Sequence, residues 1–185
     1  RHLFGQALSW PWMTVDLREF IREIPDFPEP GIIFRDITPL LLNPAAARQA
    51  TEEMVDFGRR LDVDIVVAAE ARGFILGGAI AQGLDAGFVP ARKPGRLPAE
   101  TVSVQYELEY GLDELEVHAD AFAAGARVLI HDDLIATGGT AEATIEVVEG
   151  LGGVVVGCAV LVELAALGGR RKISPHALHA VISYD

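Results

Sequence analysis

Two adjacent acids and a small-residue turn are the residues of this chain whose types and spacing most clearly predict chemistry. Asp132 and Asp133 follow the apolar run 128–130, and the turn 136–140 then opens a helical pattern that continues to Gly150. Carboxylates accept hydrogen bonds from sugar hydroxyls, and the unpaired N–H groups and the dipole at the start of a helix bind anions. We therefore predict a sugar-phosphate site at this point of the chain.

The class of ligand is narrowed by two patterns that the sequence lacks. It has neither the Gly-x-x-x-x-Gly-Lys-Ser/Thr of nucleoside-triphosphate sites nor the Gly-x-Gly-x-x-Gly of dinucleotide sites. Gly138 and Gly139 allow a phosphate to approach the backbone with no Cβ in the way. The alternative is a plain strand-to-helix turn whose acids lie in solvent. We expect His131, which precedes the acids, to be a packed imidazole rather than a catalytic one.

Two further segments place positive charge at turns. Arg72 follows a second apolar run and precedes a second helical pattern, so its guanidinium is expected at the carboxyl end of a strand, where it could bind two oxygens of a pyrophosphate. Arg92, Lys93 and Arg96 crowd a Pro- and Gly-rich loop, which would draw a polyanion toward the cleft in a chain of formal net charge −12. Each segment, taken alone, could instead be a solvated surface loop.

The segment 27–38 joins a stiff, Pro-rich arm to an aromatic side chain. Its prolines forbid regular helix, and its exposed backbone amides together with Phe34 suit stacking on a flat heterocycle and reading of its edge. Phe34 could equally be a core aromatic.

The elements that must position these residues alternate between strands and helices. Apolar, β-branched runs are typical of buried strands, and amphipathic or small-residue runs are typical of helices. The alternation predicts an α/β fold, with a mainly parallel twisted sheet flanked by helices and the N-terminal arm outside it. Asn43 and Pro44 are expected to cap and begin the second helix. The expected strands are 32–34, 64–69, 88–91, 102–106, 114–118, 128–130, 154–162 and 178–183, and the expected helices are 16–23, 44–60, 73–83 and 141–150.

Length and composition fit a single enzyme domain. The 185 residues, 50% hydrophobic and 23% charged, can fill one core. A net charge of −12 argues against general nucleic-acid binding, which needs a basic face. No apolar run reaches the ~18–20 residues of a membrane span and no secretory signal is recognised, so a cytoplasmic protein without a membrane partner is expected. The single cysteine, Cys158, is expected to be a buried small hydrophobe.

Five ordered motifs together resemble the adenine-specific members of the type I phosphoribosyltransferase family. They are Pro-Gly-Ile-Ile-Phe-Arg-Asp-Ile-Thr from residue 30, Glu-Ala-Arg-Gly-Phe from 70, Arg-Lys-Pro-Gly-Arg-Leu-Pro from 92, Leu-Glu-Tyr-Gly from 108 and Asp-Asp-Leu-Ile-Ala-Thr-Gly-Gly-Thr from 132. The resemblance implies transfer of the phosphoribosyl group of 5-phosphoribosyl-1-pyrophosphate (PRPP) to adenine, which gives AMP and pyrophosphate in purine salvage. It also implies a cytoplasmic homodimer.

The resemblance further implies a domain organisation. Residues 16–185 would form one phosphoribosyltransferase domain, in which 16–40 are a small hood that recognises the base. Residues 1–15 would be an extension of uncertain origin, and Met13 is a candidate natural start. A flexible lid loop is expected because the oxocarbenium-like state of the reaction would hydrolyse if water entered.

By the same resemblance, the motifs carry specific roles. Glu109 would manage the proton at N7 of adenine, and Arg72 and Lys93 would act with it in catalysis. Magnesium should arrive with PRPP, bound mainly by phosphates and water, so no protein metal site is predicted. The PRPP ligands would be Asp132 and Asp133 for the ribose hydroxyls, Ala136, Thr137, Gly138, Gly139 and Thr140 for the 5′-phosphate, and Arg72, Lys93 and Arg96 for the pyrophosphate. Adenine would be framed by Ile33, Phe34, Arg35 and Leu134, and the lid would carry Tyr106, Glu109 and Tyr110.

Two departures and two alternatives accompany this reading. The family more often has lysine where Arg96 stands and an apolar residue where His131 stands. A phosphoribosyltransferase for another purine, such as xanthine, would share the PRPP loops but need a different arm around Phe34. A PRPP-sensing regulator would keep 132–140, lose the lid and add a DNA-binding module, for which this chain has no room.

Overall fold

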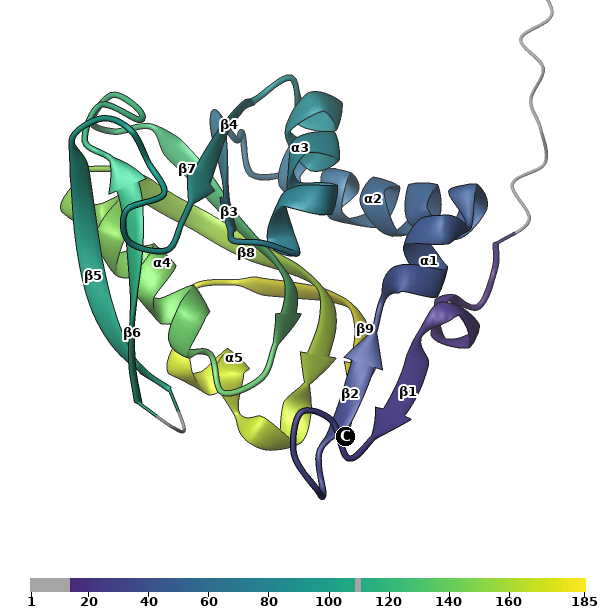
Figure 1. Ribbon diagram of the computed structural model, residues 1–185. Coiled ribbons are helices and arrows are strands. Elements are labelled where there is room, and N and C mark those ends of the chain that lie inside the picture. Colours follow the sequence, from purple (N-terminus) through teal and green to yellow (C-terminus); the bar gives the residue numbers. More distant parts are fainter. Residues whose placement is uncertain (1–13, 109–110) are drawn as a thin grey trace, which may run out of the picture. The chain divides into compact units, whose positions relative to one another are not determined.

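The computed structural model describes residues 14–108 and 111–185, which group into two compact units, one within Arg1–Gln49 and one within Ala50–Asp185 (Figure 1). Within these residues, every helix is too short or too polar to span a bilayer.

The larger unit is built on a parallel sheet of five strands in the order β4-β3-β7-β8-β9 (Figure 1). Strands buried on both faces of such a sheet are rich in apolar residues, as the sequence predicted. The α/β prediction is therefore confirmed. The strands are β3 (Ile65–Ala69), β4 (Gly87–Ala91), β7 (Arg127–Ile135), β8 (Val154–Leu164) and β9 (Leu178–Tyr184).

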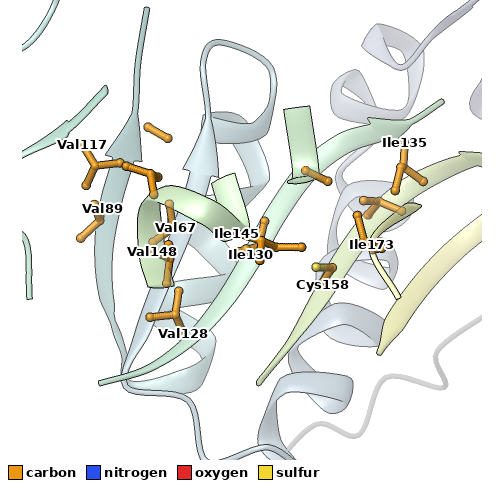
Figure 2. Packing of buried hydrophobic residues seen from close by; sticks show 14 residues of the cluster. Val67, Val89, Val117, Val128, Ile130, Ile135, Ile145, Val148, Cys158 and Ile173 are labelled. Carbon is orange, nitrogen blue, oxygen red and sulfur yellow. The ribbon is translucent and has the colours of Figure 1, made fainter. Parts of the chain in front are cut away.

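Helices cover both faces of this sheet, because successive strand residues point to opposite sides. On one face, Ile130 packs in the core with Ile145 of α4 (Gly139–Gly150), as Figure 2 shows. On the other face, α3 (Gly73–Leu84) approaches so closely that a Cβ on Gly77 would lie 2.8 Å from the Cβ of Ala68 and 3.4 Å from the His131 ring. His131 is fully buried there, so the expected packed imidazole is confirmed.

A separate antiparallel hairpin packs against α4. It consists of β5 (Thr101–Leu108) and β6 (Gly111–His118), whose register runs from Thr101 opposite His118 to Leu108 opposite Gly111. Tyr106 and Leu115 are buried against Ala143 of α4. Both strands are longer than predicted, and Tyr106, which was expected both at the end of a strand and on the lid, lies inside β5. The tip residues Glu109 and Tyr110 lie outside the described residues.

The smaller unit contains a two-stranded antiparallel ribbon of β1 (Arg22–Pro25) and β2 (Ile33–Asp36), followed by α1 (Thr38–Leu42). The helix predicted over 16–23 is wrong, since only a 3-10 turn over Leu17–Phe20 forms. The pairing of β1 with β2 satisfies the backbone from Arg22 onward and overrides the weak helical propensity.

Residues 24–37 form no helix, as their prolines predicted, and the predicted helix start is confirmed in this unit. In the arm, Asp26 Oδ1 accepts a hydrogen bond from the Gly31 N–H at 2.7 Å, and the Phe27 ring packs edge-on against Phe34 with centroids 5.2 Å apart. At the start of α2 (Pro44–Arg59), Asn43 Oδ1 accepts hydrogen bonds from the second and third helical N–H groups at 3.0 and 3.1 Å. This is the expected N-cap.

Candidate active site

A cavity of about 540 Å³ lies at the carboxyl ends of β3 and β7, beside the hairpin. Parallel strands end at the same edge of a sheet, which is where α/β folds bind ligands. The cavity gathers most of the predicted PRPP residues of the larger unit. Its lining includes Glu70, Ala71, Arg72, Lys93, Tyr106, Asp113, Leu115, Asp132, Asp133, Leu134, Ala136, Thr137, Gly138, Gly139, Thr140 and Ala141.

The paired acids lie within β7 rather than beyond its end. The strand was expected to stop at Ile130, but its ladder continues because Asp132 pairs with Val160 and Leu134 with Val162 of β8. Both acids nevertheless line the cavity.

The two acids differ in their surroundings. Asp133 is buried, and its Oδ2 forms an ion pair with Arg72 Nε at 2.8 Å. The pKa of Asp132 is raised well above its usual range, first because burial disfavours its charged form and second because the Asp133 carboxylate is adjacent. Asp132 Oδ1 still accepts a hydrogen bond from the Asp133 N–H at 2.8 Å. The carboxyl oxygens of this pair could therefore accept hydrogen bonds from neighbouring hydroxyl groups of a sugar.

The turn after β7 presents the start of α4 to the cavity. Gly138 has a φ of 89° and precedes the first helical residue, Gly139. A non-glycine residue rarely adopts that backbone conformation. The first N–H groups of a helix have no acceptor within it, so those at 139–141 are available to an anion. The prediction that this turn opens a helix is confirmed.

On the hairpin side, Lys93 meets an acid that the sequence analysis did not single out. Lys93 Nζ forms an ion pair with Asp113 Oδ2, which also accepts a hydrogen bond from the Tyr106 hydroxyl at 3.0 Å. Burial by itself would raise the pKa of Asp113, but the hydrogen bonds from Lys93, the Glu114 N–H and Tyr106 outweigh it and lower that pKa. Burial raises the pKa of Tyr106 to about 12, so its hydroxyl remains a donor. Lys93 is thus held beside the cavity by a carboxylate.

The rest of the basic loop is fixed rather than directed at the cavity. Arg92 makes two hydrogen bonds to Glu70, Nε to Oε2 at 2.9 Å and Nη2 to Oε1 at 3.2 Å, and donates a third to the Arg96 carbonyl at 3.0 Å. The pKa of Glu70 is lowered chiefly by Arg92. Lys93 lines the cavity, whereas Arg96 is not among the described residues that do so.

Three of the four residues predicted to frame adenine lie in the smaller unit. Ile33, Phe34 and Arg35 belong to the β1–β2 ribbon of the smaller unit, where Ile33 is exposed and Phe34 is half-buried. Their counterpart in the larger unit, Leu134, does line the cavity.

Glu70 and Asp113 are charged cavity residues to which the sequence analysis gave no role. Asp113 could have been found from the two-residue period of β6, since it shares a face with Leu115 and Val117, both of which are buried. Glu70 follows β3 within the same motif as Arg72, but its pairing with Arg92 joins loops that the sequence separates. No local pattern reports such a contact.

Comparisons with known proteins agree with this geometry. The family model described as a phosphoribosyl transferase domain matches residues 41–179. An adenine phosphoribosyltransferase of Rhodopirellula baltica is 52% identical over 174 residues, which cover 94% of this chain and 84% of that protein.

Two solved structures give the same match in three dimensions. The adenine phosphoribosyltransferase of Rhodothermus marinus is 54% identical with a TM-score of 0.86, covering 91% of this chain and 96% of that one. The Saccharomyces cerevisiae adenine phosphoribosyltransferase, in complex with an imino-altritol bisphosphate and adenine, is 36% identical with a TM-score of 0.84, covering 89% of this chain and 96% of that one.

Proposed function

The chain belongs to the phosphoribosyl transferase family, and on that premise we propose that it transfers the 5-phosphoribosyl group of PRPP to adenine, giving AMP and pyrophosphate in purine salvage. One observation carries the proposal. A single cavity combines the start of a helix, a pair of acids and two cations, and these groups suit the 5′-phosphate, the ribose and the pyrophosphate of PRPP respectively.

Each part of PRPP is assigned to one wall of the cavity. The 5′-phosphate is bound by N–H groups of the turn Ala136–Thr140, and the ribose hydroxyls by Asp132 and Asp133. The pyrophosphate lies toward Arg72 and Lys93, with Arg96 as a further cation of the same loop. This fixes C1 of the ribose between the leaving group and the base, so that most of the rate enhancement comes from positioning.

The charges of the cavity support a metal that arrives with the substrate. Its described lining holds four carboxylates, Glu70, Asp113, Asp132 and Asp133, against two cations, Arg72 and Lys93. A free polyanion would be repelled, but an Mg²⁺–PRPP complex brings its own positive charge and suits all-oxygen donors. Within residues 14–108 and 111–185, no three of these acids are placed so that they could hold a metal ion together. The proposal is that the phosphates and water would supply most of the ligands. When bound, Mg²⁺ would stabilise the charge that grows on the pyrophosphate.

The reaction exchanges one bond at C1 for another. The C1–oxygen bond to pyrophosphate breaks with its electron pair on that oxygen, and the lone pair of adenine N9 forms the new bond. Arg72 and Lys93 stabilise the departing pyrophosphate. Glu109, assigned by its motif, accepts the proton that adenine loses from N7 as N9 bonds to C1. The hairpin tip with Tyr110 is assigned to exclude water from the cationic intermediate. Tyr106 supports that hairpin from its buried position in β5.

Adenine recognition and assembly complete the proposal. Ile33, Phe34 and Arg35 of the ribbon, together with Leu134, are assigned to the base. A homodimer in the cytoplasm is carried over from the family, and light scattering of the purified protein and fractionation of the source cells test these two assignments.

The test of this function is pyrophosphate release from PRPP and Mg²⁺ with adenine, hypoxanthine, guanine and xanthine supplied separately. Release with adenine alone is the expected result. Release preferentially with another base would overturn the base assignment while the PRPP site stands. Binding of PRPP without release for any base would overturn the enzymatic proposal and favour a sensor.

A further inference from the structure

A short segment makes unusually close contact with the turn 136–140, which is called the phosphate turn below because it is assigned to the 5′-phosphate. The segment follows β8 and comprises a 3-10 turn (Ala165–Leu167), Gly168 and α5 (Gly169–Lys172), which lies beside the start of α4 (Figure 1). The Gly169 N–H donates a hydrogen bond to the Ala136 carbonyl at 3.0 Å. Lys172 reaches Glu142 of α4 with an ion pair of 2.9 Å.

The contact depends on two glycines that face each other. A Cβ on Gly169 would lie 2.5 Å from the Ala136 carbonyl oxygen and 3.1 Å from the Gly138 nitrogen. A Cβ on Gly138 would in turn lie 3.0 Å from the Gly169 Cα. Contacts of 2.5 Å between a carbon and backbone oxygen are not tolerated, so neither backbone can carry a side chain without moving the other.

Two anchors hold the segment in place. Arg170 makes a two-pronged ion pair with Glu163, Nε to Oε1 at 2.9 Å and Nη2 to Oε2 at 2.6 Å, and donates to the Leu178 carbonyl at 2.8 Å. Glu163 is buried at the end of β8, and Ile173, next after α5, is buried in the core with Ile135 (Figure 2). The segment is therefore fixed to the sheet on one side and to the phosphate turn on the other.

The hydrogen bond from Gly169 to the Ala136 carbonyl also orients the N–H group of the next residue, Thr137. The carbonyl of Ala136 and the N–H of Thr137 belong to one planar peptide unit, and in a trans unit they point in opposite directions. Thr137 and Gly138 line the cavity, whereas Gly169 is not among its described lining residues. A hydrogen bond that holds the Ala136 carbonyl toward Gly169 therefore holds the Thr137 N–H away from Gly169, toward the cavity.

We propose that Gly169 is a positioning residue for the 5′-phosphate, and that the Arg170–Glu163 pair fixes it in that role. The proposal rests on the assignment of the turn 136–140 to the 5′-phosphate. It deepens that assignment by naming the element that orients the turn before the ligand binds. It adds Gly169, Arg170 and Glu163, none of which touches the substrate.

The test compares two ligands that occupy different ends of the cavity. Ribose 5-phosphate probes the turn, and Mg²⁺–pyrophosphate probes Arg72 and Lys93, both by calorimetry on the whole protein. Gly169→Ala is expected to weaken ribose 5-phosphate by about tenfold or more, as for loss of a charge-assisted hydrogen bond, and to leave pyrophosphate within about twofold. The matched control is Gly150→Ala in α4, where an added Cβ has nothing within 4 Å and both ligands should bind as in the wild type.

Glu163→Gln provides a second variant that keeps the shape of the side chain and the Gly169 backbone. It is expected to weaken ribose 5-phosphate by about threefold or more with no matching change for pyrophosphate. Equal losses for both ligands, or no loss for ribose 5-phosphate in either variant, would overturn the proposal. Because both readouts are binding, they remain decisive even if the base-dependent assay fails, and that assay on the wild type separately decides the proposed function.

Discussion

Replacing His131 with leucine should remove a large part of the acid sensitivity of folding. The ring is fully buried, and its Nδ1 lies 2.8 Å from the Ala159 carbonyl. A carbonyl can only accept, so Nδ1 carries the proton and Nε2 is the atom that acid must protonate. Nε2 is buried without a hydrogen-bond partner among the described residues. Burial lowers the pKa of His131 to about 4, although the Ala159 carbonyl and the Asp133 carboxylate raise it in part.

The sign and the size of the effect follow from this pKa. An unfolded histidine, with a pKa of 6.5, takes up a proton as the pH falls through that value, whereas the folded one resists until about 4. The stabilisation is therefore present above pH 6.5 and is lost as the pH falls toward 4. A gap of about 2.5 between the two pKa values corresponds to about 3 kcal/mol of unfolding free energy.

Urea unfolding of the wild type and of His131→Leu, from about pH 7.5 down to about pH 4.5, measures this loss directly. The leucine variant is expected to lose about 2–3 kcal/mol less than the wild type over that range, whatever its stability at neutral pH. His176→Leu, which removes a partly exposed histidine that lies beside Glu149, is the control for loss of an imidazole outside the core. If the wild type and His131→Leu lose stability in parallel, the buried imidazole is not the group that acid attacks.

Three further predictions concern the acids of the site. Asp132→Asn should raise the thermal midpoint of unfolding at pH 7.5 by a few degrees, because the raised pKa of Asp132 means that the folded state loses stability as the pH rises through that pKa. The KM for PRPP should increase in the same variant. A lower midpoint measured by calorimetry would contradict this prediction. Asp113→Asn should free Lys93 from its ion pair and strengthen inhibition by pyrophosphate about two- to tenfold, because an ion pair of ~1 kcal/mol no longer competes with pyrophosphate for Lys93. Glu114→Gln, at the neighbouring residue, is the control. Equal inhibition of the two variants would refute the competition. Glu109→Gln should lower kcat by about a hundredfold or more with PRPP binding nearly unchanged, and comparable losses in both would remove Glu109 from acid–base catalysis.

The sequence predicted the sheet well because its strands are simple apolar runs between turns. Its errors arose where pairing between strands decides the outcome. The helix expected over 16–23 gave way to the β1–β2 ribbon, and β7 continued past Ile130 because β8 offers partners as far as Ile135. Strand ends and short helices depend on neighbours that lie far along the chain, and a periodicity cannot report them.

The sequence likewise predicted many residues of the candidate site but not the contacts between them. The motifs identified Arg72, Lys93 and the acids of β7, and the structure gathers them in one cavity. The partners of those cations were missed, since an ion pair such as Lys93 with Asp113 joins loops whose approach is set only by the folded chain. Gly169 was missed for the same reason, because nothing in its own neighbourhood marks it as the backbone against which the phosphate turn rests.

The missed partners explain how so acidic a chain can hold a polyanion. Arg72 already meets Asp133 and Lys93 already meets Asp113, so each cation is held in place by a carboxylate before any ligand arrives. Under the proposed function, pyrophosphate would have to compete with those carboxylates, which would limit its affinity and favour its release after the reaction. An Mg²⁺ ion that accompanied PRPP would offset the repulsion by the same carboxylates during binding. The acids of the cavity would then not oppose the proposed chemistry, because they hold the cations in position in advance and would keep the product from binding too tightly.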